Sequence, residues 1–201
     1  MIKVVPVKLD KDQIVAVALE LLNEVGLDAL TTRVLATRLG VKQPALYWHF
    51  KDRRALLDEM NEVIEAQFRA AMPATDLPWQ DYVYQMGQSF RAALMSHRDG
   101  ARVHAGSRAN RGQFEQQMSV LIRGGLPMLL AVQLMVSVGR FIVGWVLEEQ
   151  ASHTSPSDPY QLPDGLAGQA IRLFFETGDK AAFDAGLLMI IKGAEAIAGR
   201  G

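Results

Sequence analysis

Apolar side chains recur every three or four positions over residues 10–24, and this spacing is typical of an amphipathic helix. The predicted buried stripe consists of Ile14, Val17, Ala18, Leu21 and Val25. Asp10 can accept hydrogen bonds from the free amides at the helix start, with Gln13 three residues later as its capping partner. Gly26 follows directly and is expected to end the helix.

Two shorter helical patterns follow, separated by Gly40. The first covers residues 31–39 and begins with threonines that can cap a helix. The second opens at Gln43, where Pro44 favours a helix start because it has no amide hydrogen and its φ is already helical. A longer helix followed by two short helices across a glycine turn is typical of a helix-turn-helix. We assign this unit to a domain over residues 1–51, with a core that includes Leu35, Leu39, Leu46 and Phe50.

The rest of the chain predicts a larger helical domain over residues 52–201, so the expected fold class is all-α. A long helix over residues 52–71 leads out of the first domain. Pro73 and Pro78 bracket a break in the pattern. Further helices are expected over residues 79–97, 110–122, 128–150, 166–177 and 179–198. Residues 151–164 are rich in serine, proline and aspartate, which predicts a loop.

Residues 128–147 are apolar enough to raise the question of a membrane span. Arg140, Gln133 and Ser137 argue against it, because a guanidinium at the bilayer centre is costly and the flanks lack clustered basic anchors. We therefore expect a buried helix and no membrane partner. The last helix is also apolar on more than one face. These two helices either complete the core of their own chain or pack against their copies in a homodimer, which we favour.

Composition narrows the function classes further. The 201 residues include no cysteine, which excludes disulfides, thiolate nucleophiles and cysteine-based zinc sites. Residues 1–9 lack the apolar core and cleavage site of a secretion signal, so we expect a cytoplasmic protein. The net charge of −1 hides an asymmetry. Residues 31–54 carry six basic side chains against one acidic one, giving +5, and the remainder carries −6. A DNA phosphate contact surface needs such a patch, although a solvated helix face would give the same count.

The segment that opens at Gln43 is the candidate for the major groove of DNA. The amide of Gln43 can pair with adenine, Pro44 and Ala45 can contact a thymine methyl group, and Arg33 can reach a guanine. A second group suits phosphates, namely Thr32, Tyr47, His49, Lys51 and Arg53. Trp48 has two interpretations, because an aromatic residue on a short helix either anchors packing or contacts the groove.

Several short motifs together resemble the TetR family of transcriptional repressors. They are LTTR at residues 30–33, LA at 35–36, LG at 39–40, QPALYWH at 43–49 and RALL at 54–57. The likeness is dense over residues 9–58 and continues more thinly to the VLE at 146–148. It implies an all-helical homodimer and a palindromic operator with two half-sites. It also implies release from the operator when a ligand in the large domain shifts the long helix and spreads the two heads.

The resemblance also implies an effector site, which members that respond to tetracycline use for a magnesium chelate of the drug. His104 matches a metal-binding histidine, Glu148 an acid supplied by the partner subunit, Arg108 a mobile-loop arginine and Phe90 a drug-contacting aromatic. Three positions where those members have a histidine, an asparagine and a glutamine are Phe68, Met86 and Val120 here. We expect these residues and Phe141 to line the pocket.

An apolar or aromatic effector fits this lining better, because a polyhydroxylated ligand would leave buried groups unpaired. No cofactor is expected, and Mg²⁺ is expected only with a tetracycline-like effector. His104 alone does not make a metal site. The remaining alternatives are a tetracycline-Mg repressor proper, an activator or a DNA-binding regulator without small-molecule input, and an enzyme. The only candidate catalytic residues in the sequence are His104, Ser107 and Glu148, and no catalytic motif accompanies them.

Overall fold

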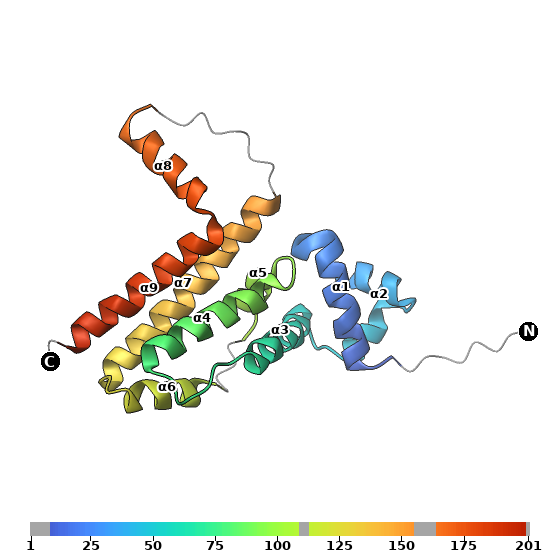
Figure 1. Cartoon of the computed structure of the whole chain (residues 1–201). Helices are drawn as coiled ribbons and strands as arrows, with labels where there is room; N and C mark the ends of the chain where they lie inside the picture. The colour runs from blue at the N-terminus through green and yellow to red at the C-terminus, as the bar shows by residue number, and fades with distance from the viewer. Residues whose placement is uncertain (1–8, 109–112, 155–163, 200–201) are drawn as a thin grey trace, which may run out of the picture.

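The computed structural model describes residues 9–108, 113–154 and 164–199, and every regular element in these ranges is helical. The elements in chain order are α1 (Lys11–Ala29), α2 (Thr32–Leu39), the 3-10 helix η1 (Gln43–Trp48), α3 (Arg53–Ala70), α4 (Trp79–Met95), α5 (Gly100–Gly106), α6 (Phe114–Arg123), α7 (Met128–Thr154), α8 (Leu166–Thr177) and α9 (Asp179–Ala198). The predicted all-α fold is confirmed. Figure 1 shows α1, α2 and η1 as a small head beside a larger body that contains the remaining helices.

The caps at the start of the chain form as expected, whereas α1 continues past Gly26 to Ala29 and Val25 of the predicted buried stripe is 38% exposed. The Asp10 side chain accepts a hydrogen bond from the Gln13 amide at 2.8 Å, and that of Thr31 accepts one from the Val34 amide at 3.2 Å. Gly26 interrupts α1 with a φ of 78°, and Gly40 ends α2 in the left-handed conformation. These caps hold the head around a core whose most deeply buried members are Ile14, Ala18, Leu21, Leu22 and Leu35.

The segment from Gln43 is a 3-10 helix, where an ordinary helix was expected. Its bonds span three residues, as in Ala45 N–H to the Lys42 carbonyl at 2.9 Å and His49 N–H to the Leu46 carbonyl at 3.0 Å. Six residues provide too few bonds to favour the wider α-helical turn, and short 3-10 pieces are common as connectors. Leu46 and Phe50 anchor the segment in the core of the head.

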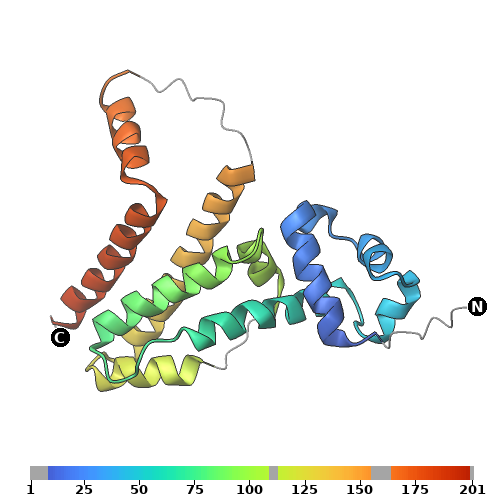
Figure 2. The same cartoon turned by 45° about the vertical axis from the view of Figure 1, so that its right-hand side comes forward.

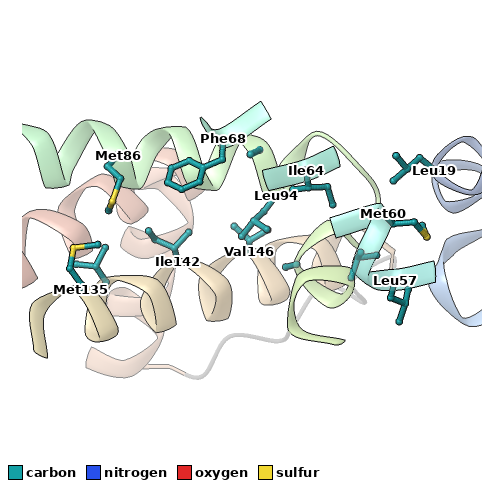
Figure 3. Close-up of a cluster of buried hydrophobic side chains, with 14 of the residues drawn as sticks. Leu19, Leu57, Met60, Ile64, Phe68, Met86, Leu94, Met135, Ile142 and Val146 are labelled. Atoms are coloured by element: carbon teal, nitrogen blue, oxygen red, sulfur yellow. The ribbon is translucent and has the colours of Figure 1, made fainter. Parts of the chain in front are cut away.

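Helix α3 leaves the head and runs into the body, where it packs on α4 and α5 (Figure 2). Met60, Ile64 and Phe68 follow one another at intervals of four residues and are all buried. Side chains at this spacing share one helix face. Figure 3 shows that this row lies between Leu19 of α1 at one end and Met86, Met135 and Ile142 of the body at the other. One continuous apolar core therefore joins the head to the interior of the body.

One helix and one boundary in the body differ from the sequence interpretation. Helix α5 was not predicted, because Asp99-Gly100 resembles a turn and only seven residues follow before the helix ends. Helix α7 continues to Thr154, so the first residues of the predicted 151–164 loop are helical. The remainder of that loop from residue 155 to 163 lies outside the described residues, as do residues 110–112 of the predicted 110–122 helix.

Helix α7 is the one element of the described chain long and apolar enough to cross a membrane, with a mean hydropathy of 1.8 over Met128–Ala151. It packs against α4, α5, α6 and α9. Val138, Ile142 and Val146 have no exposed surface. The helix is therefore a central element of the body's core, as the sequence predicted.

Helices α8 and α9 carry apolar side chains on two sides. Phe183, Leu187 and Ile191 are buried against the body, while Leu173, Met189 and Ile197 are 66%, 72% and 60% exposed. Helix α8 packs on α9 and points away from the rest of the chain (Figures 1 and 2). This arrangement leaves an apolar surface on the outside of the single chain, which is typical of a contact with another subunit.

Candidate DNA-binding surface and ligand cavity

The predicted groove residues cluster on one exposed side of the head. The Gln43 amide nitrogen donates a hydrogen bond to the Thr32 hydroxyl at 2.8 Å and lies 3.4 Å from the Tyr47 hydroxyl. The structure therefore brings residues from α2 and η1 together, although they are eleven positions apart. Arg33 is exposed one position after Thr32. A polar cluster of this kind can offer donors and acceptors to base edges and phosphates.

Trp48 does not anchor packing in this chain. Its side chain is 90% exposed, and Tyr47 beside it is 53% exposed. Burying an indole would contribute favourably, so such an exposed tryptophan indicates a surface that a partner covers. Pro44 and Lys51 are also exposed, and Ala45 and His49 are half-buried. Arg53 lies apart from this cluster, because its guanidinium donates to the Leu27 carbonyl at 3.0 Å.

The head is held to the body at a hinge formed by the end of α1 and the start of α5. The Asp99 carboxylate accepts a hydrogen bond from the Leu27 amide at 2.7 Å. Arg102 pairs with Asp28 through two hydrogen bonds of 2.6 and 3.1 Å. The hydrogen bond from Arg102 lowers the pKa of Asp28, and the charge of the same guanidinium adds to this effect.

A second set of hinge contacts involves Arg98. Its amide donates to the Asn23 side chain at 2.9 Å, and its guanidinium donates to the Glu24 carbonyl at 3.1 Å. The guanidinium also lies 3.1 Å from where a β-carbon on Gly26 would be. The left-handed φ of Gly26 and this close approach both favour glycine, so the end of α1 fits closely against the body.

Within the body, α3, α4, α5, α6 and α7 enclose a cavity of about 310 Å³. Its apolar walls come from Phe68, Met86, Phe90, Phe114, Met135, Val136 and Ile142. Figure 3 shows Phe68 and Met86 above Met135 and Ile142, four of the side chains that line it. The volume falls at the lower end of the range for small-molecule sites. A second cavity of about 590 Å³ shares Phe90, His104 and Met135 with the first and extends past Arg140.

One end of the first cavity is polar. His104 Nδ1 lies 3.1 Å from the Asn61 side-chain oxygen and 3.3 Å from a Glu65 carboxylate oxygen. A carboxylate can only accept, so Nδ1 carries a proton and donates to both groups. Asn61 and Glu65 are 2% and 4% exposed. The Gln113 amide nitrogen is also buried and has no hydrogen-bond partner among the described residues.

The predicted effector residues separate into two groups. Phe68, Met86, Phe90 and His104 line the 310 Å³ cavity. The other four do not line it. Val120 faces a different cavity beside Trp79, and Phe141 stacks on Phe183 with ring centroids 5.4 Å apart. Arg108 pairs with Asp58, and Glu148 is exposed. The exposed position of Glu148 is compatible with a role at a neighbouring subunit.

Sequence reasoning missed Asn61, Glu65 and Gln113. Asn61 and Glu65 each follow a residue of the buried row on α3 by one position, next to Met60 and Ile64. A polar residue at the border of an apolar stripe is usually solvated, so the pattern gave no sign of burial. The four-residue spacing of the two was the available signal, since it places both on one face.

Comparisons with known proteins agree with this arrangement. Residues 14–60 match the model for bacterial regulatory proteins of the tetR family, and residues 72–198 match the tetracyclin repressor-like C-terminal domain. The tetracycline repressor protein class A from transposon 1721 of Escherichia coli is 43% identical over 195 residues, which cover 92% of this chain and 90% of that protein. The chain belongs to the TetR family.

Solved TetR-family structures share the fold. A TetR variant from Acinetobacter baumannii AYE in complex with minocycline matches with a TM-score of 0.84 and 43% identity, covering 94% of each chain. TetR class A with 5a,6-anhydrotetracycline and magnesium has a TM-score of 0.72 and 38% identity, covering 94% of this chain and 99% of its own. BioQ with its natural double-stranded DNA operator has a TM-score of 0.69 and 26% identity over the same shares.

A magnesium ion was one of the family's implications, and the residues of this TetR chain do not form a site for it unaided. The described residues contain no group of three or more His, Cys, Asp or Glu side chains placed to hold a metal. Glu65 is the acid next to His104, and it shares the Nδ1 proton with Asn61. The catalytic group is not assembled either, because the Ser107 hydroxyl donates to the backbone carbonyl of His104 at 2.8 Å.

Proposed function

We propose that this TetR-family protein is a ligand-responsive transcriptional repressor that binds a palindromic operator as a homodimer. A small molecule in the 310 Å³ cavity releases it from DNA. The full-length relatives named tetracycline repressors and the BioQ operator complex support this function. The same comparisons argue against the enzyme alternative, and a role on the chromosome implies a cytoplasmic protein.

Helix α5 connects the cavity to the DNA-binding head, and this connection supports control by a ligand. His104 near its end lines the cavity, while Asp99 and Arg102 at its start hold the end of α1. A ligand that displaces His104 therefore moves a helix that is fastened to the DNA-binding head. Packed elements of this kind change between discrete arrangements, which is how a small shift at one site reaches another.

The DNA contacts are proposed in two classes. Arg33, Gln43, Pro44 and Ala45 read base edges, with Trp48 adding apolar contact to the groove. Thr32, Tyr47, His49 and Lys51 bind phosphates, and Arg53 joins them only if it gives up its bond to the Leu27 carbonyl. Two heads in one dimer would then read two half-sites about one helical turn apart.

The homodimer is supported by the apolar surface of α8 and α9. Leu173, Phe174 and Met189 are exposed in the single chain. Burying these apolar side chains against a second copy would remove them from water, which is favourable. A two-fold interface uses the same surface on both subunits, so this one patch is sufficient. We place Glu148, which is exposed on α7, at the partner's cavity in this dimer.

An apolar or aromatic effector is favoured over a tetracycline-magnesium complex, which is the second candidate. Phe68 and Met86 stand in the cavity wall, where tetracycline hydroxyl groups would lose their hydrogen bonds to water without replacement. The second candidate rests on the minocycline and anhydrotetracycline complexes of the relatives.

The deciding experiment is a compound screen coupled to an operator assay. Melting temperatures are measured against a library, with tetracycline tested with and without magnesium, and each stabilising compound is added to a gel shift of DNA from upstream of the protein's own gene. The proposal predicts that a stabilising compound releases the DNA. A shift that no stabilising compound reverses would favour a regulator without small-molecule input.

A further inference from the structure

Glu65 is the most unusual residue of the cavity, because it is a carboxylate with only 4% of its surface exposed. Burying an ionised carboxylate is costly unless it is paired. Among the arginines of the described chain, Arg91 pairs with Glu149 and Arg108 pairs with Asp58, while Arg140 lines the adjoining cavity and makes no ion pair with Glu65. The partner left for Glu65 within the described residues is His104.

His104 does not satisfy Glu65 completely. The shorter of its two Nδ1 contacts, 3.1 Å, goes to the neutral Asn61 oxygen, and the contact to Glu65 is 3.3 Å. A carboxylate has about four lone-pair sites. One Nδ1–H shared between two acceptors leaves most of these lone-pair sites at the wall of the cavity.

The walls next to this carboxylate are aromatic. The Phe68 and Phe90 rings are 5.0 Å apart at 47°, and the Phe90 and His104 rings are 5.2 Å apart at 76°. Ring faces attract cations through their negative π-surfaces. A carboxylate beside tilted aromatic rings is therefore an environment for an organic cation, with Met135 and Ile142 left to contact its apolar part.

The Gln113 amide gives independent support for a polar ligand. Gln113 lines the same cavity and is 8% exposed, and its side-chain nitrogen has no hydrogen-bond partner within the described part of the chain. An unpaired buried donor is unfavourable, so a purely hydrocarbon ligand would leave this cost in place. A ligand with a polar end can pair with the amide.

We infer that the cavity selects an amphipathic amine, with the protonated nitrogen at Glu65 and an aromatic or aliphatic body between Phe68, Phe90 and Ile142. This inference rests on the proposed function only in taking the cavity for the effector site. It refines the expectation of an apolar effector by assigning the ligand one cationic end. Glu65 is then the residue that determines specificity.

Three probes of equal length test the charge directly. Calorimetric titrations of the full protein use 4-phenylbutylamine, 4-phenyl-1-butanol and 4-phenylbutanoate at neutral pH. The amine is expected to bind at least about tenfold more tightly than the alcohol, and the acid more weakly than either, because a desolvated opposite charge favours only the amine. Equal binding of amine and alcohol, tighter binding of the acid, or no amine binding in the millimolar range would overturn the inference.

Glu65→Gln is the matched variant, because it keeps an oxygen that can accept from His104 and removes the charge. It is expected to abolish the preference for the amine while the affinity for the alcohol stays the same. Glu62→Gln is the control, since Glu62 is exposed on the same helix and does not line this cavity. The control should keep the full preference. An unchanged preference in Glu65→Gln would contradict the inference, and the wild-type probe series decides the question if that variant fails to fold.

The operator assay separates this inference from the proposed function. Amine binding that depends on Glu65 without any release of DNA supports the charge selectivity and counts against ligand-controlled repression. Release of DNA by a neutral compound that binds in the cavity as tightly as its amine counterpart supports repression and overturns the charge selectivity.

Discussion

Replacing Asp99 tests how the body holds the DNA-binding head. Asp99 has a φ of 57°, and its side chain is 13% exposed at the hinge. One carboxylate oxygen accepts from the Leu27 amide at 2.7 Å, and the other lies 3.3 Å from Arg102. Asp99→Ala removes both contacts. Asp99→Asn is the matched control, because asparagine also tolerates the left-handed conformation and keeps one acceptor oxygen.

The expected magnitude follows from these two features. A hydrogen bond to a charged group contributes about 1.5–3 kcal/mol, and alanine in the left-handed conformation costs roughly 1–2 kcal/mol. Asp99→Ala should therefore lower the free energy of unfolding by about 2.5–5 kcal/mol. Asp99→Asn should lower it by about 1 kcal/mol, since it keeps an acceptor for the Leu27 amide and loses the charge and the contact with Arg102.

The assay combines urea unfolding with an operator titration in the presence and absence of an effector. Because α5 would lose its hydrogen bond to the Leu27 amide and keep only the Arg102–Asp28 pair to α1, Asp99→Ala should also reduce the factor by which the effector weakens operator binding, and Asp99→Asn should retain most of it. If Asp99→Ala unfolds at the wild-type urea concentration and responds to the effector as the wild type does, the hinge does not carry the coupling.

Three further predictions concern the DNA surface, the cavity and pH. In gel shifts on operator variants, Arg33→Ala and Gln43→Ala should each cost about 1–3 kcal/mol of operator binding energy and relax the preference at one base pair. Lys51→Ala should weaken binding to all sequences equally. If Arg33→Ala or Gln43→Ala also weakened binding to every sequence equally, that residue would not read a base. Gly139 lines the cavity, and a β-carbon at this position would meet open space. Gly139→Leu should therefore fill part of the cavity and weaken effector binding about tenfold or more in calorimetry, while Gly139→Ala should change the affinity little. Equal affinities in the two variants would place the effector elsewhere. Burial lowers the pKa of His97 below its usual 6.5, so this residue contributes stability above about pH 6.5, and the contribution is lost as the pH falls through the lowered pKa. Between pH 7.5 and pH 5.5, the free energy of unfolding measured in urea should fall less in His97→Gln than in the wild type. An equal fall in both proteins would show that His97 is not the group responsible.

The sequence predicted the helices where the periodicity was long and the ends were marked. The boundaries of α8 and α9 agree with expectation, and so do the cap of α1 at Asp10 and the turn at Gly40. Helix α5 was missed because its start depends on the tertiary contact of Asp99 with Leu27, which no local pattern contains. The 3-10 geometry of η1 likewise depends on its short length more than on its residue types.

The candidate sites were predictable to different degrees. The DNA surface was accessible because its residues lie close together in sequence, although the bond between Gln43 and Thr32 required the fold. For the cavity, Phe68 and Met86 were identified through the family resemblance. Glu65 and Gln113 were not, because each is polar and becomes buried only when α5 and α6 cover it.

In the proposed mechanism, an effector in the cavity and DNA on the head each weaken the binding of the other. Reciprocal titration measures this mutual weakening directly. The affinity of a library-identified effector is measured for the free protein and for the protein saturated with operator, and the operator affinity is measured with and without the effector. Each ligand is expected to weaken the binding of the other by the same factor, roughly 5–150-fold. An effector that binds the free and the operator-bound protein with equal affinity would contradict it.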